Sequence, residues 1–240
     1  MRLIVGISGA SGVIMGYQML KALKQLPDME VHLIITEGAV KNFECETNIE
    51  ISRLAELADF THSNKNLAAS ISSGSFVTDG MIIIPASMKT VAGIASGFAE
   101  NLLLRAADVC LKENRKVVLV PRELPLSRIH LRNIKEAADY GCCVVPPVLT
   151  FYNGADTVEK QIQHISMQMP QGVFGALHNM RTFGDVMTNH VFRLRGRGDT
   201  AFGDDFHTLA QRRNLLKRLT ERSFTLVAAI NISMIDRSDP

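Results

Sequence analysis

A cation and a carboxylate, Arg122 and Glu123, stand side by side directly after the short apolar run 116–121. A run this short between charged flanks is typical of a strand buried on both faces. In open α/β sheets, ligands bind beyond the carboxyl ends of the strands. A fixed cation beside a carboxylate suits an anionic, phosphate-bearing substrate and a proton transfer there. For these two residues alone, an ordinary ion pair at a strand end is an equally open interpretation.

A second candidate site is the small-residue turn 8–12, which follows the apolar run 2–8 and precedes a predicted helix. Small residues let the backbone approach a phosphate, and the free amides and dipole of a helix start favour an anion. Ser11 is the expected N-cap of that helix. The glycine spacing is GxxGxxG, not the dinucleotide pattern GxGxxG, so a tight turn with a capping serine stays an alternative.

Hydroxyl groups follow the next two predicted strands. Thr36 closes the strand 31–36, and Ser87 and Thr90 follow the strand 81–85. Hydroxyls at a helix start suit a phosphate or the edge of a flavin ring, although read alone they are more often caps. Because the carboxyl ends of parallel strands meet at one edge of the sheet, we expect these turns to converge on one ligand.

The turns belong to a regular alternation of strands and helices. Alternation of this kind predicts βαβ units and a parallel sheet that is covered on both faces. Asn64 to Gly80 is rich in Ser, Ala and Gly and is expected to be a long loop. The expected strands are 2–8, 31–36, 81–85, 116–121 and 142–145, and the expected helices are 12–26, 39–46, 127–140 and 157–169, with helical material over 90–112 that breaks near Gly97.

Length and composition set the remaining bounds. The 240 residues, 46% of them hydrophobic, are enough for one domain with a full core, and the net charge of +2 gives no sign of a nucleic-acid partner. No apolar run is long enough to span a membrane, and the start of the chain lacks a signal-peptide pattern. Four cysteines without a CxxC pair predict buried, reduced thiols in a cytoplasmic protein. A basic segment at 209–219 is read as a solvated face.

In combination, the motifs of this chain resemble those of the flavin prenyltransferases of the UbiX/Pad family. Members were formerly called phenylacrylic acid decarboxylases or 3-octaprenyl-4-hydroxybenzoate carboxy-lyases. The resemblance extends over roughly residues 1–165. It is carried by the stretches 8–12, 85–90, 101–102, 105–113, 120–131, 146–147 and 151–152.

The resemblance implies a Rossmann-like, or flavodoxin-like, three-layer α/β/α sandwich over residues 1–168, with 169–240 as an atypical C-terminal extension. It also implies a homo-oligomer, from trimer to dodecamer. The activity implied is transfer of a dimethylallyl group from dimethylallyl phosphate to N5 and C6 of reduced FMN, without a metal. The prenylated FMN would then serve a UbiD-type decarboxylase.

Site residues are implied position by position. Gly9, Ser11, Thr36, Ser87, Thr90 and Arg122 match FMN-contacting positions. Arg105, Lys112, Arg122 and Tyr152 match positions around the substrate phosphate. Glu46, Glu123 and Ser11 match positions close to the atoms that react. Cations and a phenol on the phosphate oxygens would stabilise the charge of the leaving group, and Glu123 or the departing phosphate could accept a proton.

Two departures from the family pattern leave alternatives open. Gln168 stands where the family has a phosphate-binding arginine, and the chain has no tryptophan to match the Arg-Trp pair of the family tail. One alternative is an FMN-binding decarboxylase subunit without transferase activity. The other is a flavin-dependent cysteine decarboxylase, but Lys89 stands where those enzymes have an asparagine, and the flanks of His62 do not fit their catalytic histidine.

Overall fold

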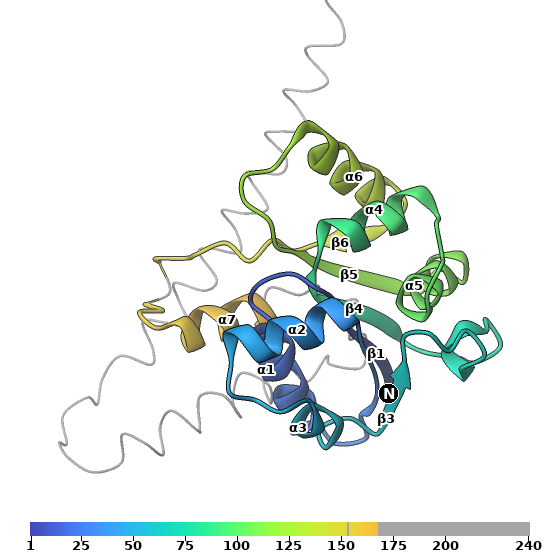
Figure 1. Cartoon of the computed structure of the whole chain (residues 1–240), viewed down its shortest axis with the longest axis horizontal. Coiled ribbons are helices and arrows are strands. Elements are labelled where there is room, and N and C mark those ends of the chain that lie inside the picture. Colours follow the sequence, from blue (N-terminus) through green and yellow to red (C-terminus); the bar gives the residue numbers. More distant parts are fainter. Residues whose placement is uncertain (153, 168–240) are drawn as a thin grey trace, which may run out of the picture. The chain divides into compact units, whose positions relative to one another are not determined.

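A computed structural model describes residues 1–152 and 154–167 of the chain. The predicted extension 169–240 and Gln168 lie outside the described residues, so the division of the chain at residue 168 stays a prediction. The described elements follow one another as alternating strands and helices, coloured from blue to yellow in Figure 1. They are β1 (Arg2–Ile7), α1 (Ile14–Leu23), β2 (Glu30–Ile35), α2 (Glu37–Glu46), α3 (Ile51–Ala55), β3 (Phe60–Ser63), the 3-10 helix η1 (Ser70–Ser72), β4 (Gly80–Ala86), α4 (Met88–Ser96), α5 (Leu102–Lys112), β5 (Lys116–Pro121), α6 (Arg128–Asp139), β6 (Cys142–Val144) and α7 (Val158–Met167).

The six strands form one sheet in the order β3-β2-β1-β4-β5-β6, and every pair is parallel. From β1 the chain adds β2 and then β3 on one side of the sheet. It then returns to the other side of β1, where it adds β4, β5 and β6. The neighbours β1 and β4 mark the switch point of a doubly wound sheet, where ligands of such folds bind. The predicted all-parallel α/β fold is confirmed.

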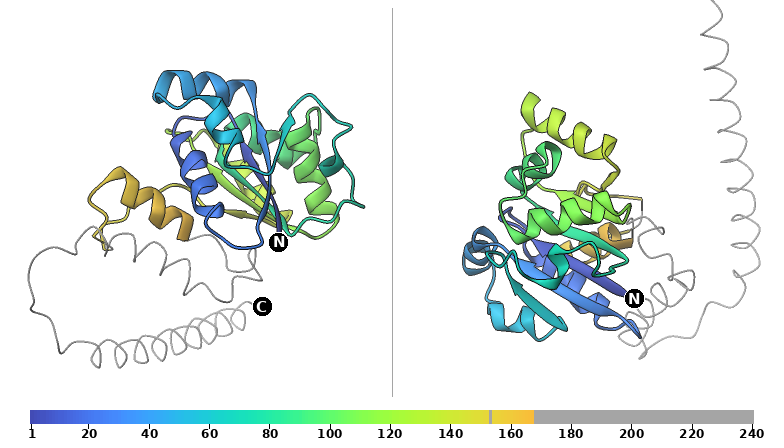
Figure 2. Two further views of the ribbon diagram at one scale, coloured as in Figure 1. Left: turned by 90° about the horizontal axis from the view of Figure 1, so that it is seen from below. Right: turned by 90° about the vertical axis from the view of Figure 1, so that its right-hand side faces the viewer.

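Helices cover both faces of the sheet, as the views in Figure 2 show. On one face, α1, α2, α3 and α7 pack on side chains such as Leu3, Val5 and Ile82. On the other face, η1, α4, α5 and α6 pack on side chains such as Ile4 and Met81. Alternate residues of β1 thus belong to opposite cores, which explains why the central strands read as unbroken apolar runs. The fold has three layers, as expected.

The sequence missed three short elements, α3, β3 and η1, and the starts of α1, α2 and α4 each differ by two residues from the predicted ones. The edge strand β3 has the sequence Phe-Thr-His-Ser, which offers one apolar residue and no alternation. The five-residue helix α3 has too few turns to show a helical period. Helix α1 begins at Ile14 rather than Gly12, because Gly12 has a φ of 89° and cannot continue into a right-handed helix. The break predicted near Gly97 separates α4 from α5.

Candidate active site

An open cleft of about 680 Å³ lies where the carboxyl ends of β1, β2, β4 and β5 meet. Its size is in the range of small-molecule sites. Four of the residues predicted to contact a cofactor line it, together with the predicted proton acceptor: Gly9, Thr36, Ser87, Thr90 and Glu123. The expected convergence of the strand-end turns is therefore present in one chain.

Two helix N-termini lie at this cleft, each capped by a predicted site residue. Thr36 caps α2 by accepting a hydrogen bond from the Ala39 amide at 3.2 Å. Ser87 caps α4 by accepting from the Thr90 amide at 3.2 Å. The positive end of each helix dipole favours an anion in the cleft. These hydroxyls are caps and cleft-lining groups at once, so the two interpretations of them do not exclude each other.

The side-chain hydroxyls of Ser87 and Thr90 also bond to each other, with their oxygens 3.0 Å apart. One hydrogen is shared between the two oxygens, so one of the two O–H groups remains to donate elsewhere. The buried Ser8 fixes this turn through two hydrogen bonds. Its Oγ accepts from the Ser87 amide at 2.7 Å and donates to the Pro85 carbonyl at 3.1 Å. The β4 turn is thus tied to the β1 turn and keeps a donor at the cleft.

Gly9 packs closely against the turn that follows β2. A Cβ atom at Gly9 would lie 3.0 Å from the Cα of Gly38, so the missing side chain lets the backbones after β1 and β2 touch. The glycine therefore shapes the floor of the site by close backbone packing.

Glu46 takes the place that was expected for Ser11. Helix α1 has Val13 as its N-cap, without a side-chain cap bond, and the Ser11 side chain is exposed, so the prediction that Ser11 caps this helix is wrong. The Glu46 carboxylate instead accepts from the amides of Gly12 at 2.7 Å and Val13 at 3.3 Å. The anion at the start of α1 is therefore the Glu46 carboxylate, which comes from the end of α2.

Arg122 and Glu123 follow β5 as predicted, and both are exposed. The Arg122 amide donates to the Ala86 carbonyl at 3.1 Å, which ties the end of β5 to the turn before α4. Glu123 lines the cleft and accepts a bond at 3.2 Å from the amide of its own neighbour Leu124. The carboxylate is therefore held by a local bond and faces the cleft without a cation of the same chain bound to it in any described contact.

Arg105 and Lys112 do not line the cleft. Both lie on α5, which starts at the cleft with Asn101 and Leu104 and leads back toward the start of β5. Lys112 comes eight residues after Leu104, or roughly 12 Å further along the helix axis. The guanidinium of Arg105 bonds to Asp108 at 2.6 Å and to a backbone carbonyl of η1 at 3.2 Å, and Lys112 pairs with its neighbour in sequence. Neither cation is in a described contact with Glu123.

Tyr152 follows β6 on a segment beside α7, and its side chain is 81% exposed. Its hydroxyl lies 3.2 Å from Nε2 of His164, and both residues line a small cavity of about 190 Å³. Gln168 lies outside the described residues, so the effect of replacing the family arginine stays a prediction.

Sequence reasoning missed two ion pairs at the cleft. Lys65 pairs with Glu37 at 2.5 Å, and Lys89 pairs with Glu100 at 3.4 Å, with all four residues lining the cleft. The Lys65 ammonium lowers the pKa of Glu37 through their hydrogen bond. Each pair joins segments that are far apart in the sequence, so no local pattern could reveal it. Their side chains are largely exposed, and such pairs contribute little stability.

No group of three or more His, Cys, Asp or Glu side chains in the described part is arranged to hold a metal ion. Among the helices of residues 1–152 and 154–167, none has the length and apolar character needed to cross a bilayer.

The family of this chain follows from its similarity to known proteins. A family model described as Flavoprotein matches residues 1–168. A probable UbiX-like flavin prenyltransferase of Sedimentibacter hydroxybenzoicus is 66% identical over 165 residues, which cover 69% of this chain and 87% of that protein. The chain belongs to the UbiX/Pad family of flavin prenyltransferases. The resemblance seen in the motifs is thereby confirmed.

Solved structures of UbiX-like proteins agree with this family. A dodecameric FMN-dependent UbiX-like decarboxylase of Escherichia coli O157:H7 is 51% identical, with a TM-score of 0.68 over 69% of this chain and 89% of that one. AnUbiX, solved in complex with FMN and dimethylallyl pyrophosphate, is 44% identical, with a TM-score of 0.69 over 72% of this chain and 91% of that one. The UbiX/Pad fold therefore extends over the described part of the chain.

Proposed function

We propose that this protein is a flavin prenyltransferase that transfers a dimethylallyl group from dimethylallyl phosphate to N5 and C6 of reduced FMN. The observation that carries the proposal is one cleft at the β1–β4 switch point, which is lined by the N-termini of two helices and by the Glu123 carboxylate. Membership in the UbiX/Pad family supports it. The relative AnUbiX was solved with FMN and an allyl pyrophosphate together.

The cleft suits FMN in size and in the chemistry of its donors. Two helix N-termini and the Ser87–Thr90 hydroxyl pair would receive the phosphate and the polar edge of the ring. The backbone contact of Gly9 with Gly38 keeps that wall free of side chains. We assign FMN binding to Gly9, Ser11, Thr36, Ser87, Thr90 and Arg122. Reduced FMN, when bound, would supply the electron-rich ring that accepts the prenyl group.

The residues of the chain would act on the leaving phosphate and on a proton. The allyl carbon–oxygen bond breaks, and its electron pair leaves with the phosphate, so cations and a phenol on the phosphate oxygens stabilise the growing charge. We assign this role to Arg105, Lys112, Arg122 and Tyr152. Glu123 faces the cleft as a proton acceptor, directly or through the phosphate. We also assign Glu46, whose carboxylate bonds to the start of α1, and Ser11 to the reacting region.

Because neither Arg105 nor Lys112 lines the cleft of its own chain, we propose that a second copy supplies them. They lie on α5, and both are at least partly exposed. One UbiX-like relative is a dodecamer, which supports an assembly in which neighbouring copies meet. In a symmetric assembly, each copy can give its cations to one neighbour and receive those of another. Trimer and dodecamer both satisfy this requirement.

A mixing experiment tests the shared site. Lys112→Ala and Glu123→Gln chains each lack one half of it. Lys112→Ala should chiefly raise the KM for the allyl phosphate and Glu123→Gln should lose most prenyl transfer, so at low allyl phosphate both pure assemblies are expected to be nearly inactive. If the two halves come from different copies, random one-to-one co-assembly restores both groups in roughly a quarter of the sites. If both groups come from one chain, no site has both, and the mixture stays as inactive as its parts.

We propose that the product serves a UbiD-type decarboxylase in the cytoplasm. Among the described residues, all four cysteines are free thiols, as a reducing compartment would leave them. Burial raises the pKa of Cys110 and of Cys142 to about 11, so neither is a ready nucleophile. Adding the reaction mixture to an apo-decarboxylase should restore decarboxylation. An FMN-binding subunit without transferase activity would leave the apo-decarboxylase inactive.

A further inference from the structure

Helix α7 holds the segment that carries Tyr152 through a buried amide. Gln161 is 9% exposed, and its side chain makes four hydrogen bonds to this segment. Its Oε1 accepts from the amide and the hydroxyl of Thr150 at 3.0 and 3.2 Å. Its Nε2 donates to the carbonyls of Thr150 and Ala155, both at 2.7 Å. The backbone is thus tied to α7 on both sides of Tyr152.

His164, three residues after Gln161 on α7, reaches the Tyr152 side chain itself. Nε2 of His164 lies 3.2 Å from the phenol oxygen. The two rings meet edge to face, with centroids 5.7 Å apart and planes at 82°. Since residues three apart share a face of a helix, Gln161 fixes the backbone and His164 fixes the ring from one side. An otherwise exposed tyrosine is therefore held in one direction.

We propose that His164 is a positioning residue that orients the Tyr152 phenol toward the substrate phosphate; this inference rests on the proposed prenyl transfer. The phenol has one hydrogen and can donate it to one acceptor only. When Nε2 of His164 carries a hydrogen, it donates to the phenol oxygen and leaves the phenol O–H to donate to phosphate. A hydrogen bond donated by His164 thus affects phosphate binding, which packing of its ring alone would not do.

Binding of dimethylallyl phosphate to the full-length protein loaded with oxidised FMN tests the proposal, measured by titration calorimetry without turnover. Tyr152→Phe removes the donor and should weaken binding about tenfold, the scale of one hydrogen bond to a charged group. His164→Phe keeps an aromatic ring but lacks the N–H, and should weaken binding by about fivefold. His164→Gln keeps an N–H donor and should stay within about twofold of the parent.

The double variant decides whether His164 acts through Tyr152. In the Tyr152→Phe background, His164→Phe should add no loss beyond about twofold, since the phenol it orients is gone. Equal losses in both backgrounds, or parent-like binding by His164→Phe, would overturn the proposal. So would a parent that fails to bind dimethylallyl phosphate. His164→Leu replaces His164→Phe, with the same expectation, if circular dichroism shows the latter to be unfolded.

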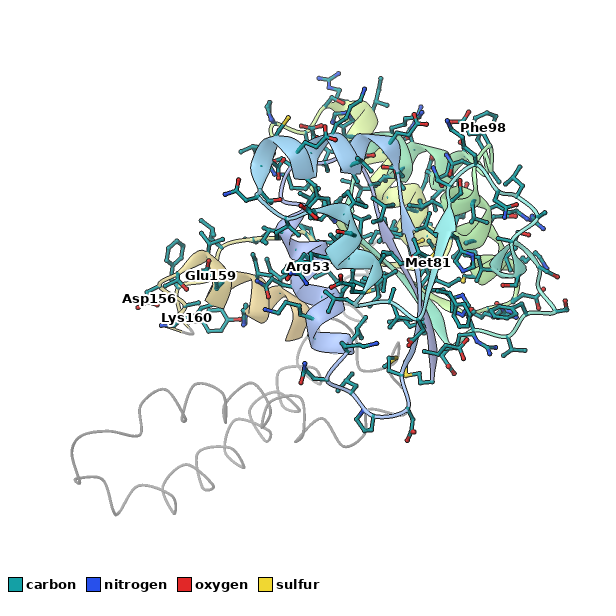
Figure 3. All side chains as sticks on the ribbon, turned by 60° about the horizontal axis from the view of Figure 1, so that its bottom comes forward. Arg53, Met81, Phe98, Asp156, Glu159 and Lys160 are labelled. Carbon is teal, nitrogen blue, oxygen red and sulfur yellow. The ribbon has the colours of Figure 1, made fainter. Side chains whose placement is uncertain are left out.

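Glu159→Gln is the control on the same helix. Figure 3 shows Glu159 near Asp156 and Lys160 at the start of α7, away from the sheet residue Met81. This variant should bind like the parent. If the parent binds dimethylallyl phosphate as expected but gives no prenylated flavin, the proposed activity fails while the role of His164 in binding stands, so the two failures are distinguishable.

Discussion

The Glu46 carboxylate lies 2.7 Å from the amide nitrogen of Gly12 and caps the first turn of α1 across 34 positions of the sequence. The same oxygen accepts from the Val13 amide at 3.3 Å. A group that the family resemblance places near the reaction is therefore also the structural anion of the β1 turn. Any flavin phosphate at this turn has to share these amides with Glu46 or displace it.

Glu46→Ala should lower the free energy of unfolding by about 1 kcal/mol, the usual cost of losing an N-terminal cap. Glu46→Gln keeps an oxygen that can accept from Gly12 and should lose less. Chemical denaturation measures both values. Glu44→Ala, an exposed neighbour on the same helix, is the control and should unfold like the parent. Equal stability of Glu46→Ala and the parent would show that the carboxylate is not a cap in solution.

Thr90→Val should weaken FMN binding by about tenfold, because it removes one hydroxyl of the Ser87–Thr90 pair and keeps the side-chain shape. The Ser87 cap of α4 uses the Thr90 amide and is retained. Quenching of flavin fluorescence measures the affinity. Ser96→Ala removes a hydroxyl at the other end of α4 and should leave the affinity unchanged. Parent-like affinity of Thr90→Val would mean that the phosphate site has been misplaced.

Glu123→Gln should bind FMN like the parent but lower kcat by about a hundredfold or more, since a proton acceptor is replaced by an amide of the same shape. Its side chain lines the cleft and makes only a local bond, so stability should change little. Steady-state kinetics with reduced FMN separates kcat from KM. A variant that keeps the parent's kcat would exclude proton transfer by Glu123.

The strand ends were readable from the sequence because short apolar runs and small or hydroxylated turns are local signals. Ser87 and Thr90 reached the cleft as predicted. What the sequence could not show depends on contacts between distant segments. Glu46 replaced Ser11 at the start of α1, and Lys65 paired with Glu37 at the cleft. The edge strand β3 was missed because its residues are mostly polar.

The same limit applies to the cations of α5. Motif matching placed Arg105 and Lys112 around the substrate, yet it carries no information on which copy of the chain supplies them. Neither residue lines the cleft of its own chain, and Lys112 lies two turns of α5 beyond Leu104. Family membership and the three-layer fold, in contrast, follow from many local motifs at once, and both predictions are confirmed.

His62 should make the stability depend on pH. Burial, and then the neighbouring His32, lower the pKa of His62. The His32 ring lies between His62 and Glu30, with one ring nitrogen 2.9 Å from Nε2 of His62 and the other 2.8 Å from the Glu30 carboxylate. The unfolded chain therefore binds more protons than the folded chain below about pH 6.5, so stability is present above this pH and falls as the pH falls toward the lower folded-state pKa.

His62→Gln should flatten this dependence in thermal denaturation between about pH 7.5 and about pH 5.5. Thr61→Ala, an exposed residue of the same strand β3 that cannot titrate, is the control and should keep the slope of the parent. A His62→Gln protein that loses as much stability on acidification as the parent would place the titrating group elsewhere.

The mass of the flavin after anaerobic incubation of the parent protein with reduced FMN and dimethylallyl phosphate tests prenyl transfer most directly. The expected product is an FMN that is heavier by one five-carbon prenyl unit, formed only when protein and allyl phosphate are both present, and formed without added metal. FMN that stays bound to the protein but keeps its original mass would show that the protein is not a flavin prenyltransferase.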